Sequence, residues 1–310
     1  MSRKRIQNRI ADSRMALPIT AVYAVMACLA CGFIGQHLWW QFAMLVLSTY
    51  MMVELNNANA LIRIYSRMVS CSYLVLTVMS PFLLMSVPHA ATQMFLVAFF
   101  LLLFRCYQDK RAAGGLFYAF AMLGMASLAF VQILYFVPVV WVLLFTNIMA
   151  GNVRTWCASL LGLMLPYWCV GGYCVYVGQV DALYAHIEGL WQFARLADVG
   201  AVSLSQALSV GVVVVVAVIG MVHFHRNSFM DKIRTRMLFE VFTTFILCII
   251  VFAVLQPQHL SFLHSMLLVC VSPLAGHFIS LTHTRATNVT FLALLAIVLG
   301  VTVYNIWMLS

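Results

Sequence analysis

Long apolar runs recur along almost the whole chain and leave little room for any other kind of segment. Of the 310 residues, 65% are hydrophobic and only 8% are charged, and the mean hydropathy is +1.02. A soluble domain carries about 25% charged residues. So much apolar surface needs lipid as its solvent, and a helical crossing of a bilayer takes about 20 residues. The sequence predicts an all-α fold, a polytopic transmembrane helical bundle that forms a single integral membrane domain over residues 1–310.

About eleven spans fit into this length. Their expected ranges are 15–34, 38–54, 70–87, 91–105, 115–131, 133–149, 157–177, 205–222, 237–255, 260–280 and 288–307. No polar loop separates the fifth span from the sixth, so residues 115–149 form either a tight hairpin or a broken pair.

The basic residues distinguish the two sides of the membrane, because lysine and arginine collect in cytoplasmic loops. With a cytoplasmic amino terminus, the cytoplasmic segments are 1–14, 55–69, 106–114, 150–156, 223–236 and 281–287, and all 17 lysines and arginines except Arg195 lie in or beside them. The carboxyl terminus and a long loop at about 178–204 are then external. Because the net charge of +9 lies at span ends, it does not indicate a nucleic-acid partner.

The external loop has a helical pattern of its own. One face, at 100° per residue, holds Leu183, Tyr184, Ile187, Leu190, Trp191 and Ala194. A narrow opposite face holds Asp181, Glu188, Gln192 and Arg195. The pattern predicts an external amphipathic helix in the membrane interface, with aromatic anchors. This helix is either a packed surface element or one wall of an external groove for a lipid-linked or amphipathic ligand.

No motif in the chain predicts a metal site or a cofactor. The nine cysteines are odd in number and lie mostly in apolar runs, so they are expected to pack as small side chains. His223, His225, His259 and His264 have no third ligand at metal spacing. His277, within the tenth span, is expected to be a hydrogen-bonded packing residue.

Charged side chains are rare inside the expected spans. Glu54 and Glu240 lie near cytoplasmic span ends, where Glu54 is expected to pair with Arg63 or Arg67, and Glu240 with Arg236. A proton- or ion-coupled transporter usually needs a carboxylate nearer the midplane, so such transport is disfavoured.

Prolines interrupt several of the expected spans. They are Pro18, Pro81, Pro138, Pro166 and Pro273. Each frees a backbone carbonyl and bends its helix. The bends either shape a cavity or serve packing alone, and packing is the preferred interpretation.

A pattern of small residues and prolines extends over most of the chain. It comprises residues 113–128, Pro138, residues 154–156 and 160–167, and also residues 56–63 and 272–274. The pattern resembles an uncharacterised family of bacterial multi-pass inner-membrane proteins, classed as a domain of unknown function. Members are sometimes labelled beta-carotene monooxygenase, but this sequence has no visible set of iron-ligand histidines. The resemblance implies the bacterial inner (plasma) membrane and no particular activity.

Residues 114–138, with a glycine-rich span, an alanine-serine-leucine run and a proline-bearing span, carry a weaker similarity. They resemble integral-membrane glycosyltransferases that use polyprenyl-phosphate sugars. Those enzymes place a catalytic carboxylate in a long external loop after the first span, whereas the loop here, about 35–38, is short and holds no acid. If the chain is such an enzyme, the candidate catalytic residues are Asp181, Glu188 and Asp198.

The leading functional interpretation is a non-catalytic scaffold or accessory protein in cell-envelope assembly. One alternative is a glycosyl- or lipid-transfer enzyme that uses a polyprenyl-phosphate donor at the external face. Another is a transporter of a small or lipidic substrate. The expected partners are membrane lipid and a membrane protein or polyprenyl-linked lipid.

Cysteine labelling in a cysteine-free background tests the expected orientation. Lys232→Cys should be protected from an impermeant thiol reagent applied to intact cells, and Asp198→Cys should react, because the two positions lie on opposite sides. Both should react once the cells are permeabilised. Protection at 198 together with reaction at 232 would disprove the orientation.

Overall fold

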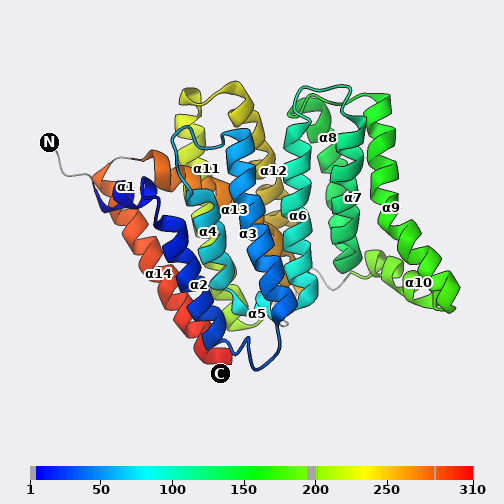
Figure 1. The fold of residues 1–310 in the computed structure, drawn as a ribbon, viewed down its shortest axis with the longest axis horizontal. Helices are drawn as coiled ribbons and strands as arrows, with labels where there is room; N and C mark the ends of the chain where they lie inside the picture. The colour runs from blue at the N-terminus through cyan, green and yellow to red at the C-terminus, as the bar shows by residue number, and fades with distance from the viewer. Residues whose placement is uncertain (1–4, 194–199, 201, 283, 310) are drawn as a thin grey trace.

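The computed structural model describes residues 5–193, 200, 202–282 and 284–309, and every regular element in these ranges is helical (Figure 1). The α-helices are α1 (Ile6–Ala11), α2 (Ala16–Ala30), α3 (Trp39–Asn59), α4 (Met68–Val78), α5 (Pro81–Leu84), α6 (Val87–Arg105), α7 (Ala113–Ala129), α8 (Val137–Thr146), α9 (Val153–Val177), α10 (Val180–Glu188), α11 (Leu204–Asn227), α12 (Ile233–Leu255), α13 (Leu260–Leu281) and α14 (Arg285–Leu309). Short 3₁₀ helices are η1 (Val131–Phe136), η2 (Gly189–Trp191), η4 (Ser228–Met230) and η5 (Pro257–His259).

Six helices in these described ranges are long and apolar enough to cross a membrane. They are α6, α9, α11 with η4, α12, η5 with α13, and α14. Shorter apolar helices are α2, α4, α7 and η1–α8. The expected all-helical class, with several membrane-compatible helices, is confirmed.

Helix α13 lies at the centre of the bundle and packs against α4, α6, α11 and α12. In its most apolar stretch 89% of residues are buried, against 11% for α9 at the periphery. A helix that is apolar on all sides is buried on all sides, and small side chains let neighbouring backbones approach closely. At Gly276, an added Cβ would lie 2.8 Å from the backbone nitrogen of Val69 on α4.

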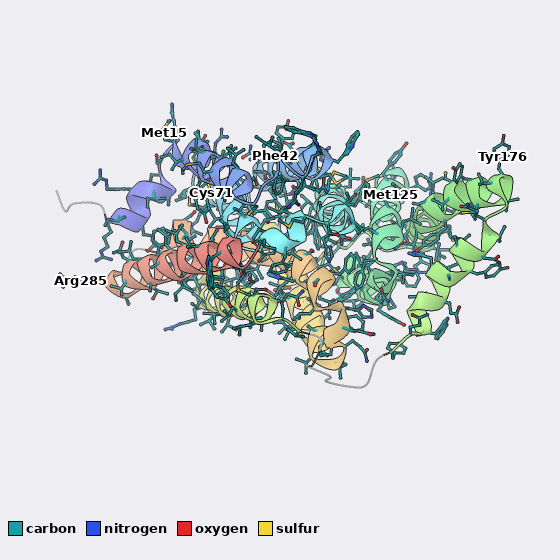
Figure 2. The ribbon with its side chains drawn as sticks, turned by 90° about the horizontal axis from the view of Figure 1, so that it is seen from below. Met15, Phe42, Cys71, Met125, Tyr176 and Arg285 are labelled. Carbon is teal, nitrogen blue, oxygen red and sulfur yellow. The ribbon has the colours of Figure 1, made fainter. Side chains whose placement is uncertain are left out.

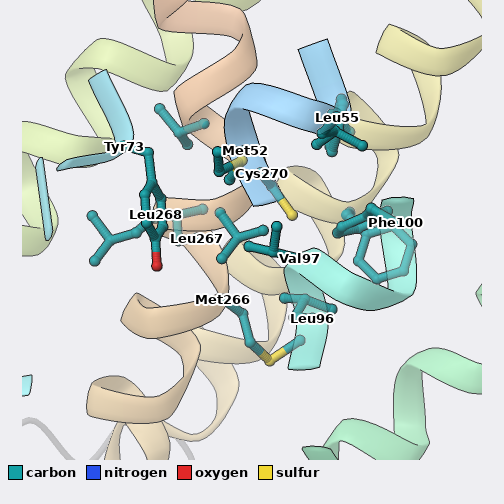
Figure 3. Packing of buried hydrophobic residues seen from close by; sticks show 14 of the residues in the cluster. Met52, Leu55, Tyr73, Leu96, Val97, Phe100, Met266, Leu267, Leu268 and Cys270 are labelled. Atoms are coloured by element: carbon teal, nitrogen blue, oxygen red, sulfur yellow. The ribbon is translucent and has the colours of Figure 1, made fainter. Parts of the chain in front are cut away.

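Phenylalanines fill the space between α6 and α12. Phe100 contacts Phe242 and Phe245 at ring-centroid distances of 5.0 and 5.1 Å, and Phe104 contacts Phe242 at 5.2 Å. Figure 3 shows Phe100 and Val97 of α6 beside Met266 and Cys270 of α13. Offset and edge-to-face aromatic pairs of this kind each add about 0.5–1.5 kcal/mol beyond their buried area.

The span expected at 70–87 is interrupted. Helix α4 ends at Val78, and the four-residue α5 begins at Pro81. Proline has no amide hydrogen to continue the helical ladder, and Ser80 before it has non-helical backbone angles (φ −115°, ψ 67°). By contrast, α9 and α13 continue through Pro166 and Pro273. Pro166 packs beside Gly124 of α7, so this proline serves packing.

Residues 115–149 form a hairpin. Helix α7 ends at the extended residue Phe130, and η1 and α8 lead the chain back. The amide of Gln108, just before α7, donates to the carbonyl of Ile148, just after α8 (2.8 Å). This bond closes the open end of the hairpin, whose second arm begins as the 3₁₀ helix η1 and continues as α8.

The amphipathic pattern at 178–204 corresponds in part to helix α10, which leaves the bundle beside α9 (Figure 1). The α-helical part ends at Glu188, and Leu190 and Trp191 continue in η2. Ala194 and Arg195, the last members of the two predicted faces, lie outside the described residues. Tyr184 and Trp191 are 70% and 76% exposed, as membrane-interface anchors would be.

Glycine makes the close contact between α7 and α9 possible. A Cβ at Gly162 would lie 2.2 Å from the carbonyl oxygen of Phe117, whereas a Cβ at Gly172, on the same helix, would meet nothing within 4 Å. Gly162→Ala should therefore destabilise the protein by about 1–3 kcal/mol, a typical overpacking cost, and Gly172→Ala should not. Thermal unfolding in micelles compares the two, and equal melting temperatures would contradict this packing.

Candidate functional site

The acids proposed for an external enzyme site do not form a catalytic pair. Asp181 lies in the first turn of α10 and Glu188 ends it, and both are exposed. Seven residues along a helix place the two side chains on one face, about 10 Å apart. Asp198 lies outside the described residues. Neither of these two acids lines either of the two best-defined cavities among the described residues.

Helix α10 and the 3₁₀ helix η2 that follows it make polar contacts with the bundle. His186 Nε2 lies 3.1 Å from the carbonyl oxygen of Ser127. Gln132 Nε2 donates to the carbonyl of Gly189 (3.1 Å), and the Tyr135 hydroxyl donates to that of Leu190. No residue of α10 is buried. The carboxylates of Asp181 and Glu188 are exposed to solvent, which is the position expected of charged side chains without any catalytic role.

The larger cavity, of about 380 Å³, lies between α2 and α14. Helices α4 and α13 form its floor, and α1 lies at one end. Figure 2 shows Cys71 of α4 between α2 and α14. Ligand sites commonly have volumes of roughly 300–1,000 Å³, so the cavity is of adequate size for part of a ligand.

Hydrogen bonds join α1 and α2 to α14 on either side of this cavity. Near the start of α14, the Gln7 amide donates to Asn288 Oδ1 (3.1 Å), and Gln7 Nε2 donates to the carbonyl of Ile279 (2.9 Å). Farther along, the Tyr23 hydroxyl donates to Thr302 Oγ1 (2.9 Å). Between these contacts, the lining includes small side chains such as Ala16 and Ala275, which leave space.

The cavity is apolar and open at the side. Ile19, one of its lining residues, is 63% exposed, so the cavity reaches the surface between α2 and α14. Ser72 of α4 also lines it, and its buried hydroxyl has no hydrogen-bond partner in the protein. The Ser72 oxygen is itself fully buried, so it lies behind the cavity surface rather than on it.

A polar cluster surrounds the break between α4 and α5. Asn305 Nδ2 of α14 donates to the carbonyl of Met79 (2.7 Å) and to Ser209 Oγ of α11 (2.8 Å). His264 Nε2 of α13 lies 3.4 Å from Ser80 Oγ. Irregular backbone in a membrane must be satisfied by neighbouring groups, and Asn305 satisfies the Met79 carbonyl. The cluster therefore stabilises the interruption.

A second polar cluster joins α13 to the segment between α11 and α12. His277 Nε2 lies 2.9 Å from Asp231 Oδ2, and their side chains are 1% and 3% exposed. His277 Nδ1 lies 3.3 Å from His223 Nδ1. The expectation that His277 is hydrogen-bonded is met, but the role of Asp231 was missed. The sequence contains only a weak indication of this role, because Asp231 is the one acid in the basic segment 223–236.

The described histidines, cysteines and acids contain no group of three or more placed to hold a metal ion.

Other polar contacts differ from the expected pairs. Glu54 pairs with Arg105 of α6 (3.3 Å), because α3 and α6 pack along each other. Glu240 Oε2 accepts from Asn147 Nδ2 (2.9 Å).

Removing Asp231 should cost more stability than removing an exposed acid. Asp231→Ala leaves a buried imidazole nitrogen without its partner, at a cost of about 1–3 kcal/mol. Glu54→Ala should cost less than about 1 kcal/mol, because its pair with Arg105 is exposed to solvent. Thermal unfolding of both variants tests this difference, and a smaller loss for Asp231→Ala would rule out an anchoring role.

The lateral cavity, the two buried polar clusters and the solvated acids of α10 are the features that bear on function. No family model, no curated protein and no solved structure matches this chain.

Proposed function

We propose that the chain is a multi-pass inner-membrane protein that acts without catalysis, as an accessory of envelope assembly that holds a lipid. Its site is the cavity between α2 and α14. The observation that carries this proposal is an apolar cavity of about 380 Å³ open at the side of the bundle. A cavity with these properties suits a hydrocarbon chain, because burial of each methylene is worth about 0.8 kcal/mol.

The proposed membrane arrangement has about eleven crossings, made by α2, α3, α4–α5, α6, α7, η1–α8, α9, α11, α12, α13 and α14. The amino terminus is cytoplasmic, the carboxyl terminus is external, and α10 lies in the external interface. The charge distribution supports this orientation. In it, Ile19 at the cavity opening faces the bilayer, so a lipid enters sideways without crossing water.

A catalytic role has less support. Asp181 and Glu188 line neither described cavity, and they lie about 10 Å apart on a solvated helix. The lining of the larger cavity contains no acid or histidine. Such a lining favours holding a lipid over reacting with it.

Filling the cavity tests this function. Leu295 of α14 lines the cavity, whereas Leu292, on the same helix, does not and is 37% exposed. Leu295→Trp should remove most of the lipid that remains bound after purification in a mild detergent, because the indole occupies its space. Leu292→Trp should retain it. Native mass spectrometry measures the bound lipid per protein.

Two outcomes would refute the proposal. One is wild-type protein that carries no lipid under these conditions. The other is equal lipid retention by the two tryptophan variants, provided both remain folded and monodisperse.

A further inference from the structure

We infer that the lipid held in this cavity is an anionic glycerophospholipid of the cytoplasmic leaflet, whose phosphate lies at the α1 end of the cavity. This inference rests on the proposed function and adds a head-group class to it. Its basis is the position of three arginines near one end of this apolar cavity.

The basic end is built by α1 and the start of α14. Ile10 and Ser13 line the cavity, and their chain neighbours Arg9 and Arg14 are exposed. Arg285, also exposed, begins α14. Figure 2 shows Arg285 beside α1 at this end of the molecule.

The contacts of Gln7 fix this arrangement. Its backbone amide and side chain bind Asn288 and the carbonyl of Ile279, so α1 is held against α14 and the end of α13. Arg9 lies two residues after Gln7, and Arg285 lies three residues before Asn288. Arg9 and Arg285 thus lie on elements that these hydrogen bonds hold together, and Arg14 follows the lining residue Ser13.

The charge at this end favours an anion. Asp12 lies there too, but arginine outnumbers it, and the amino-terminal end of α14 adds a partial positive charge. Basic pockets between helices on the cytoplasmic side are typical binding sites of anionic lipid head groups. Arginine also binds phosphate through two parallel N–H donors.

The other end of the cavity lacks this character. There, Tyr23 and Thr302 form a neutral hydrogen bond, and the lining near it is Val298 of α14. An acyl chain can lie along the apolar floor of α4 and α13 toward Tyr23, while the phosphate remains among the arginines.

Lipid titration measured by native mass spectrometry tests the head-group assignment. The full chain, delipidated in dodecyl maltoside, is mixed with phosphatidylglycerol or with phosphatidylcholine of identical acyl chains. Phosphatidylglycerol should bind about tenfold more tightly, since each nearby arginine contributes to the attraction. A third arm uses a polyprenyl phosphate, which should bind more weakly than phosphatidylglycerol.

Variants identify the residues responsible. The triple change Arg9→Gln, Arg14→Gln and Arg285→Gln should abolish the preference for phosphatidylglycerol and leave phosphatidylcholine binding unchanged. A matched control, Arg111→Gln, Arg154→Gln and Arg236→Gln, neutralises arginines in segments that do not line the cavity, and it should keep the preference. Arg3, Lys4 and Arg5 remain in both variants and maintain the expected orientation.

The results separate this inference from the function on which it rests. Equal binding of the two phospholipids, or tighter binding of the polyprenyl phosphate, would overturn the anionic glycerophospholipid and leave a lipid-holding cavity in place. A preference that survives the Arg9, Arg14 and Arg285 changes would also overturn it. Failure of wild-type protein to bind any of the three lipids would overturn both.

Discussion

The packing of α13 is the constraint on which the other helices depend. Because nearly every side of α13 is buried, its neighbours must surround it and must approach closely at Gly276 and at Leu274, where Gly220 of α11 fits. Van der Waals contact between close backbones is a principal source of helix association in lipid, where the hydrophobic effect between helices is lost. The outer helices α2, α9 and α14 are then free to have larger exposed apolar faces.

Polar groups inside this apolar bundle occur where the backbone or a connection needs an anchor. Asn305 binds the carbonyl of Met79 near Pro81, and Asp231 in the α11–α12 connection binds His277 of α13. Buried polar groups are costly unless they are paired. Each cluster therefore favours the arrangement seen here, in which the Asn305 amide nitrogen and the Asp231 carboxylate have partners.

Much of the fold could be predicted because its main determinant is local. Apolar runs of suitable length identify the helices, and a helix covers at least part of every expected span. The break at Ser80 was not predicted, although Pro81 follows it. In the sequence Pro81 looks like Pro166 and Pro273, which do not break their helices. The cavity could not be predicted at all. Its lining comes from six separated helices, α1, α2, α4, α11, α13 and α14, and no single stretch of sequence contains the contacts that bring them together.

The contact between Tyr23 and Thr302 has a consequence for the order of assembly. The two residues are 279 positions apart. Chains are made from the amino terminus, and earlier segments can fold before later ones appear. Helices α2, α4 and α13 can pack during synthesis, but the wall formed by α14 arrives only afterwards. A chain interrupted before α14 would have an open apolar groove where the assembled bundle has a bounded cavity, so this cavity exists only after α14 has been made.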